Sequence, residues 1–292
     1  FRRVLFRSAL YAVVLWQLTE RPILLVTAEN QSAEALTELT DTFFHLLIGR
    51  PEAGEPQLLP ALDVLPGQNL SPHNEVAEQR AIGLWRLAAG KTPITVASCA
   101  SALFRTYDAA HYRRLAVTLR TGEELPLETI EAHLQSIGYE RREPVEMTGE
   151  YSIRGGILDV FPAESQRPLR VEFFGDEIES IRRFDVETQR SVMKVTEADV
   201  LPLAELPRIV GAAEPGWEFH AALENPREHS LLDLLGTRRE SDEKHPIVIL
   251  DEPEQLKQAS ERLWKRLSQY NETSELAEAN FLAWDDLEKR RS

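Results

Sequence analysis

The neighbouring segments GEYSIRGGILDVFP (residues 149–162) and RVEFFGDEIESIRRFD (residues 170–185) decide the fold of the middle of this chain. Apolar and polar residues alternate along both with the period of two that is typical of β-strands. Working outward, the sequence predicts a helix at 125–138 and consecutive strands at 139–145, 149–154, 156–161, 169–174, 177–185 and 191–201. Successive strands with short turns form an antiparallel sheet, so we expect a small α+β domain over residues 119–202.

One face of this predicted sheet carries an unusual mixture of side chains. The alternation in RVEFF places Arg170, Glu172 and Phe174 together, opposite Val171 and Phe173. A small domain cannot bury both faces of one sheet, so we expect the first set to point outward. Arginine and aromatic side chains on a rigid sheet are typical of protein-binding hot spots.

Arg154 is expected on the same outward face, before a glycine pair that permits a bulge or a sharp turn. A second interpretation of the face stays open. In it, Phe174 packs under a loop and the arginines pair with Glu172 or Asp176, without any partner.

Helices and strands alternate on both sides of the predicted small domain. The sequence indicates helices at 9–20, 32–49 and 75–90, strands at 23–27 and 94–98 and from residue 57, and a further strand and helix within 246–267. Strands that alternate with helices form a parallel sheet covered on both faces. We therefore predict an α/β domain over residues 9–118 and 203–292, split by the small α+β domain.

Composition excludes several classes of protein. The 292 residues carry 48 acidic and 33 basic side chains, a net charge of −15, which repels a phosphate backbone and argues against an autonomous DNA- or RNA-binding protein. Cys99 is the only cysteine and cannot form an internal disulfide. No segment approaches the apolar length of a membrane span, so we expect a cytoplasmic protein without membrane contact.

The first eight residues, FRRVLFRS, are set apart from the domains. One reading frame of a widely used sequencing adapter encodes this string, so we interpret Phe1–Ser8 as read-through at a truncated contig end.

Two short motifs weakly suggest nucleotide chemistry. AAGKT (88–92) ends like a phosphate-binding loop, but a helix precedes it and a strand follows, so Gly90 is interpreted as a helix C-cap. ILDEP (249–253) resembles the strand and acid that hold magnesium in motor ATPases. Asp251 is at least as well explained as the N-cap of the helix that follows.

No catalytic or metal-binding constellation emerges from the other residues. The histidines show no paired ligand spacing with one another or with Cys99. Ser71 lies near a histidine but lacks the elbow glycines of a hydrolase nucleophile, so Ser71 or Asn74 is interpreted as a helix cap. We therefore predict no catalytic residue, no metal and no cofactor.

Three segments resemble a known family. GEYSIRGGILDVFP, RVEFFGDEIESIRRFDVETQRS (170–191) and ALDVLPGQNLSPHNEVAEQR (61–80) resemble the N-terminal, UvrB-like module of the bacterial transcription-repair coupling factors, the Mfd family. The resemblance runs from about residue 9 to the end of the chain. UvrB, the excision-repair helicase, shares the pattern of the small domain, but it would begin with an intact phosphate-binding loop and differ around SPHNE.

This resemblance implies a degenerate helicase-like (P-loop NTPase-type) α/β domain without ATPase activity, split by a domain that binds UvrA, the damage-recognition ATPase of nucleotide excision repair. Carried over by motif, the UvrA-contacting residues are Arg154, Arg170 and Phe174, with Glu172 between them on the same face. The full-length protein is then expected to be an ATP-dependent DNA translocase that binds RNA polymerase and double-stranded DNA through domains absent here. We expect the present fragment to be a monomer.

The expected function is therefore non-catalytic: recruitment of UvrA to lesions that stall RNA polymerase, in transcription-coupled nucleotide excision repair. The alternative is a UvrB-like, ATP-dependent helicase fragment with a true nucleotide site. In that alternative, Asp251 and Glu252 would serve magnesium and water.

Overall fold

The computed structural model describes residues 2–49, 54–206, 214–235, 245–270 and 274–291. The chain divides into two compact units. The first unit contains residues 1–113 and 214–292, and the second contains residues 114–213.

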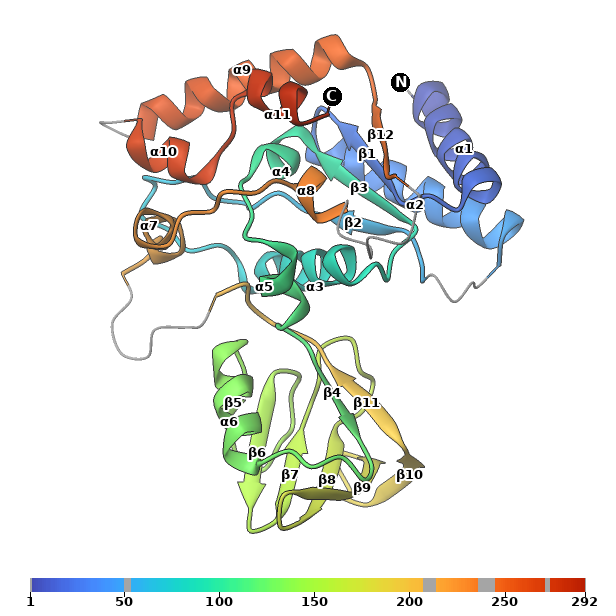
Figure 1. The fold of residues 1–292 in the computed structure, drawn as a ribbon, viewed down its shortest axis with the longest axis vertical. Helices are drawn as coiled ribbons and strands as arrows, with labels where there is room; N and C mark the ends of the chain where they lie inside the picture. The colour runs from blue at the N-terminus through green and yellow to red at the C-terminus, as the bar shows by residue number, and fades with distance from the viewer. Residues whose placement is uncertain (1, 50–53, 207–213, 236–244, 271–273, 292) are drawn as a thin grey trace. The chain divides into compact units, whose positions relative to one another are not determined.

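The first unit is built on a four-stranded parallel sheet with the strand order β12-β1-β3-β2, which confirms the predicted parallel sheet (Figure 1). Its elements are α1 (Arg2–Thr19), β1 (Ile23–Thr27), α2 (Asn30–Leu47), β2 (Gln57–Leu59), α3 (Asn74–Ala89), β3 (Ile94–Ser98), α4 (Cys99–Leu103), α5 (Ala109–Arg113), α7 (Trp217–Glu224), α8 (Leu231–Leu235), β12 (Ile247–Leu250), α9 (Pro253–Tyr270), α10 (Glu275–Asn280) and α11 (Trp284–Arg291).

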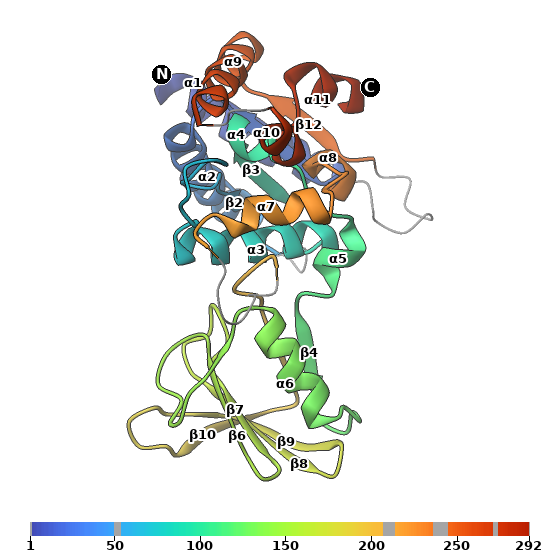
Figure 2. The same cartoon turned by 90° about the vertical axis from the view of Figure 1, so that its left-hand side faces the viewer.

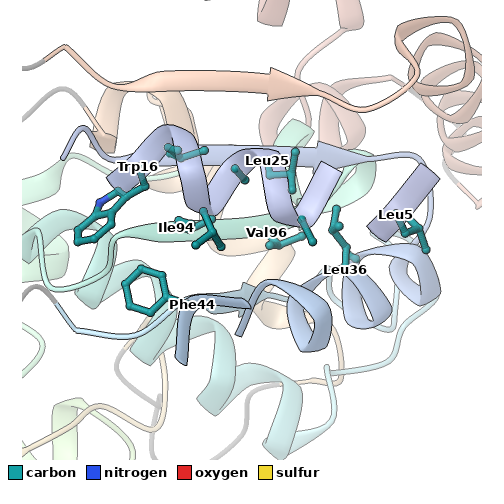
Figure 3. Packing of buried hydrophobic residues seen from close by; sticks show 12 residues of the cluster. Leu5, Trp16, Leu25, Leu36, Phe44, Ile94 and Val96 are labelled. Atoms are coloured by element: carbon teal, nitrogen blue, oxygen red, sulfur yellow. The ribbon is translucent and has the colours of Figure 1, made fainter. Parts of the chain in front are cut away.

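The core of the first unit lies on both sides of this sheet. On one side, Ile23 and Leu25 of β1 join a cluster with the buried residues of α1 and α2, among them Trp16 and Phe44, whose ring centroids are 5.1 Å apart (Figure 3). On the other side, Leu24 and Val26 face apolar residues of α4, α8 and α11. Because helices cover both faces of the sheet, all five residues of the run ILLVT are buried.

Helix α1 begins earlier than the sequence predicts. Because residues 1–8 were set apart from the domains, we expected the helix from residue 9, whereas it starts at Arg2. Leu5 lies in the same buried cluster as Ala9, Ala12 and Trp16 because these positions share one helical face. Phe1 lies outside the described residues.

The second unit contains a six-stranded sheet with the order β10-β9-β8-β7-β6-β5 and a separate pair, β11-β4. All pairs are antiparallel except β5-β6, so the predicted antiparallel sheet is confirmed for the other strands. Its elements are β4 (Val117–Arg120), α6 (Leu127–Ser136), β5 (Glu140–Arg141), β6 (Glu150–Arg154), β7 (Ile157–Val160), β8 (Leu169–Phe174), β9 (Glu177–Phe184), β10 (Ser191–Val195) and β11 (Glu197–Val200).

Helix α6 packs along one face of the six-stranded sheet (Figure 2). Its buried residues are Ile130 and Leu134, and its Gln135 donates a hydrogen bond of 2.8 Å to the hydroxyl of Tyr151, which is buried on β6. The expected single strand over 191–201 is two strands instead, because β10 pairs with β9 whereas β11 pairs with β4.

Two local predictions have different outcomes. Gly90 ends α3 in the left-handed conformation with φ 66°, which confirms the predicted C-cap glycine. Helix α2, expected over residues 32–49, begins earlier at Asn30, with Glu29 in the N-cap position and Ser32 already inside the helix and buried. Within the described residues, no helix is both long enough and apolar enough to cross a bilayer.

Two leucines of α2 allow a matched test of the first core. Leu36 is 0% exposed in the cluster against β1, whereas Leu46 on the same helix is 73% exposed. We expect Leu36→Ala to lower the free energy of unfolding by about 2–5 kcal/mol, because it leaves a cavity between the helices and the sheet. Leu46→Ala should change it by less than about 0.5 kcal/mol. Urea unfolding followed by tryptophan fluorescence measures both, and equal effects would contradict this assignment of the core.

Candidate functional site

The face of the six-stranded sheet that points away from α6 is here named the polar face. Strand pairing defines its members, because residues opposite one another in adjacent strands share a face. Its members include Ser152 and Arg154 of β6, Ile157 and Asp159 of β7, Arg170, Glu172 and Phe174 of β8, Glu177, Ser180, Arg182 and Phe184 of β9, and Lys194 of β10. The structure thus places all the predicted site residues on one face.

The centre of the polar face is an ion pair between Asp159 and Arg170. Arg170 Nε donates to Asp159 Oδ1 and Arg170 Nη2 to Oδ2, both at 2.7 Å. The guanidinium also donates to the backbone and side-chain oxygens of Gln189 and lies over the ring of Phe184, 4.5 Å from its centroid. Hydrogen bonding to Asp159 raises the pKa of Arg170 above its usual value. Arg170 is therefore held on every side.

Arg154 approaches the same carboxylate from β6 but is bound less completely. Its Nη2 donates to Asp159 Oδ2 at 3.1 Å, and its Nη1 lies 3.6 Å from an oxygen of Glu143, which is itself exposed. The side chain of Arg154 is 52% exposed, compared with 17% for Arg170. Of the two arginines, Arg154 is the one whose charge faces solvent.

A second charged group lies beside the first. Glu172 Oε2 accepts hydrogen bonds from Ser180 Oγ at 2.7 Å and from Arg182 Nη2 at 3.0 Å. This arrangement fixes the carboxylate of Glu172 across β8 and β9. Its charge is balanced within the sheet.

Phe174 ends β8 and is 80% exposed, so it does not pack under a loop. The pairing of β8 with β9 explains how the other side of the strand is buried. Glu172 pairs with Ser180, but Phe173 pairs with Ile178, so Glu179 is an extra residue in β9 that forms a bulge. Phe173 thereby stays on the side of buried Ile178, and Phe174 points outward.

The ion pairs correct one interpretation of the sequence. The arginines were considered to pair with Glu172 or Asp176, but both Arg154 and Arg170 bind Asp159. Asp159, the residue on which both arginines converge, was not singled out from the sequence. A signal for it exists in ILDVF, where a single acid interrupts an apolar strand that must pair with the arginine-bearing RVEFF.

Comparisons with known proteins bear on the same unit. Residues 117–206 match the model of the family described as the UvrB interaction domain. The chain is 28% identical over 310 residues to the transcription-repair-coupling factor of Myxococcus xanthus, in an alignment that covers 92% of this chain and 26% of that protein. It is 34% identical over 165 residues to that of Haemophilus influenzae, which covers 56% of this chain and 14% of that protein. Identity to the Escherichia coli factor is 28% over 210 residues, covering 71% and 18%.

The alignment covers 26% of the Myxococcus xanthus protein, so the chain spans about a quarter of the length of that relative. The matched family model coincides with the unit that carries the polar face, because β4 through β11 lie within residues 117–206.

The motif ILDEP of the first unit lies at the carboxyl end of β12. Helix α9 begins at Pro253, so Glu252 and not Asp251 directly precedes it. Asp251 Oδ1 accepts a hydrogen bond from Ser8 Oγ at 2.8 Å. A cavity of about 210 Å³ beside it has two carboxylates and no basic side chain among its described lining residues. A triphosphate needs cationic partners or a loop of backbone amides, so this geometry does not favour a nucleotide site.

Other candidate chemistry in the first unit is also weak. Lys91 of AAGKT lies over the ring of Trp85, 4.6 Å from its centroid. The described part of the chain contains no group of three or more histidine, cysteine or acidic side chains placed to hold a metal ion. Cys99 is a buried free thiol, and burial raises its pKa to about 12.

The buried thiol gives a direct chemical prediction. At pH 8, a pKa of about 12 leaves only about one ten-thousandth of Cys99 as the reactive thiolate, and the protein also shields the sulfur. We expect a disulfide reagent such as DTNB to label the native chain at least about 100-fold more slowly than the urea-unfolded chain. The unfolded chain serves as the control for one thiol per molecule. Rapid labelling of the native chain would show that the region around α4 opens readily.

Proposed function

This chain is related to the transcription-repair coupling factors and its residues 117–206 belong to the UvrB interaction domain family, and on that premise we propose that it is a non-catalytic module that recruits UvrA in transcription-coupled nucleotide excision repair. In this proposal, the polar face is the surface on which UvrA docks. The proposed contact residues are Arg154, Arg170, Glu172 and Phe174.

One observation carries the proposal. Phe174 is 80% exposed at the end of a strand whose other outward side chains are fixed by ion pairs and hydrogen bonds. A phenylalanine in water is unfavourable for the isolated chain, whereas in an interface it buries a large apolar area at little cost in entropy. An aromatic anchor within a polar surround is the composition of a transient protein interface.

The remainder of the proposal concerns the whole protein. We propose that the full-length protein is an ATP-dependent DNA translocase, which binds RNA polymerase and double-stranded DNA through regions other than these residues. The present chain then supplies the link to damage recognition. Its net charge of −15 agrees with a module that contacts a protein and leaves DNA to other regions.

The proposal is tested by titration calorimetry of the purified chain with UvrA. We expect Phe174→Ala and Arg154→Ala each to weaken binding by at least about tenfold, because truncation of an aromatic or arginine anchor removes buried contact area. Circular dichroism checks that each variant folds.

Matched controls lie on the same unit, outside the polar face. Met193 on the edge strand β10 is 52% exposed, and the side chain of Arg141 on β5 is 58% exposed and paired with Glu131 of α6. Met193→Ala and Arg141→Ala should leave the affinity for UvrA unchanged. If the wild-type chain does not bind UvrA, or if Phe174→Ala binds as tightly as the wild type, the proposed docking surface is wrong.

A further inference from the structure

We infer that Asp159 is a positioning residue for partner binding: it holds Arg154 in the orientation in which that side chain meets the partner, while Arg170 neutralises Asp159 from the other side. The inference rests on the proposed function. It assigns different roles to two arginines that the sequence pattern treats alike.

The first step is the burial of Asp159. Its side chain is 3% exposed, and its two oxygens accept three hydrogen bonds from two guanidinium groups. An unpaired carboxylate at such a depth is strongly unfavourable, so the two guanidinium groups stabilise it there. A partner cannot reach Asp159 directly. Any effect of this residue on binding must therefore pass through the arginines.

The second step separates the two arginines. Arg170 uses Nε, Nη1 and Nη2 in bonds to Asp159 and Gln189, and one face of its guanidinium covers Phe184. With 17% of its side chain exposed, it has little freedom to rearrange toward a partner. Arg170 thus acts mainly as the counter-ion of Asp159.

The third step concerns the charge on Arg154. A bidentate arginine already balances the charge of Asp159, so the hydrogen bond from Arg154 fixes one end of its guanidinium without cancelling its charge. Glu143, 3.6 Å away and exposed, is a weak competitor because water screens such pairs. Arg154 therefore presents a positive charge with its orientation already restricted, which lowers the entropic cost of binding.

These steps define the chemistry of the partner surface. It should supply a carboxylate opposite Arg154 and an apolar recess for Phe174, which lies on the same face. If the partner binds Arg154 in the orientation that Asp159 holds, replacing Asp159 should weaken binding even though Arg154 is still present.

The test is a double-mutant cycle on the affinity for UvrA, with Asp159→Asn, Arg154→Ala and the combination of both. We expect Asp159→Asn to weaken binding by at least about tenfold in the wild-type background, but by less than about threefold when Arg154 is already alanine. A purely structural role for Asp159 would give the same loss in both backgrounds. The control is Asp199→Asn, since Asp199 is a partly buried acid of the other sheet and accepts a hydrogen bond of 2.5 Å from Thr118.

The outcomes are distinguishable. If the wild-type chain binds UvrA and Asp159→Asn binds equally well, or loses affinity equally in both backgrounds, the positioning role is refuted and the proposed function stands. If the wild-type chain does not bind UvrA, both fall. Should Asp159→Asn not fold by circular dichroism, Asp159→Glu replaces it in the cycle. This variant keeps the charge but displaces the carboxylate by one methylene, and its effect on binding is expected to depend on Arg154 in the same way.

Discussion

The polar face depends on one buried carboxylate that accepts hydrogen bonds from two guanidinium groups. Asp159 on β7 binds Arg154 on β6 and Arg170 on β8, and Arg170 extends the connection to Phe184 on β9. One acid thus ties four neighbouring strands together by side chains, in addition to their backbone ladder. Among the residues of the second unit that the structure describes, no helix covers this face, and the pairing explains how its outward side chains are still held in defined positions. Phe174 is the exception, because it stays exposed while its neighbours Arg170 and Glu172 are held by ion pairs and hydrogen bonds.

Much of this fold follows from local sequence. The buried runs ILLVT and ITVAS become adjacent parallel strands, and the alternation in RVEFF places the predicted residues on one face. The remaining features depend on contacts between distant residues. The period of two cannot show that residues 191–201 pair with two different strands, nor can it show that Leu5 would be buried against α2 and so extend α1 toward the chain start. Such outcomes are decided by tertiary packing, which overrides local preference.

The candidate site, too, is predicted by local sequence only in part. Residue type and alternation identify Arg154, Arg170, Glu172 and Phe174 as one outward set, but they cannot rank these residues. The ranking comes from the neighbouring strand, since Asp159 stands opposite Arg170 and consumes its donors, while Arg154 retains an exposed end. An acid within an apolar strand is the only sequence signal of this arrangement, and without knowledge of the pairing it is indistinguishable from an ordinary surface residue.

The bulge at Glu179 has a further consequence, for the tolerance of the chain to insertion and deletion. Ile178 and Ser180 would share a face in a regular strand, yet Ile178 lies with the core and Ser180 binds Glu172 on the polar face. Because of the extra residue, the alternation of inward and outward side chains in β9 reverses between its two halves. Loss of Glu179 alone would restore a regular ladder and leave the isoleucine in the core and the serine on the polar face, because neighbouring residues of a regular strand point to opposite faces. Loss of one residue within the regular part of β9 that follows would instead turn the side chains on one side of the deletion to the wrong face. The hairpin that carries Phe174 should therefore tolerate a deletion at the bulge better than one elsewhere in this strand.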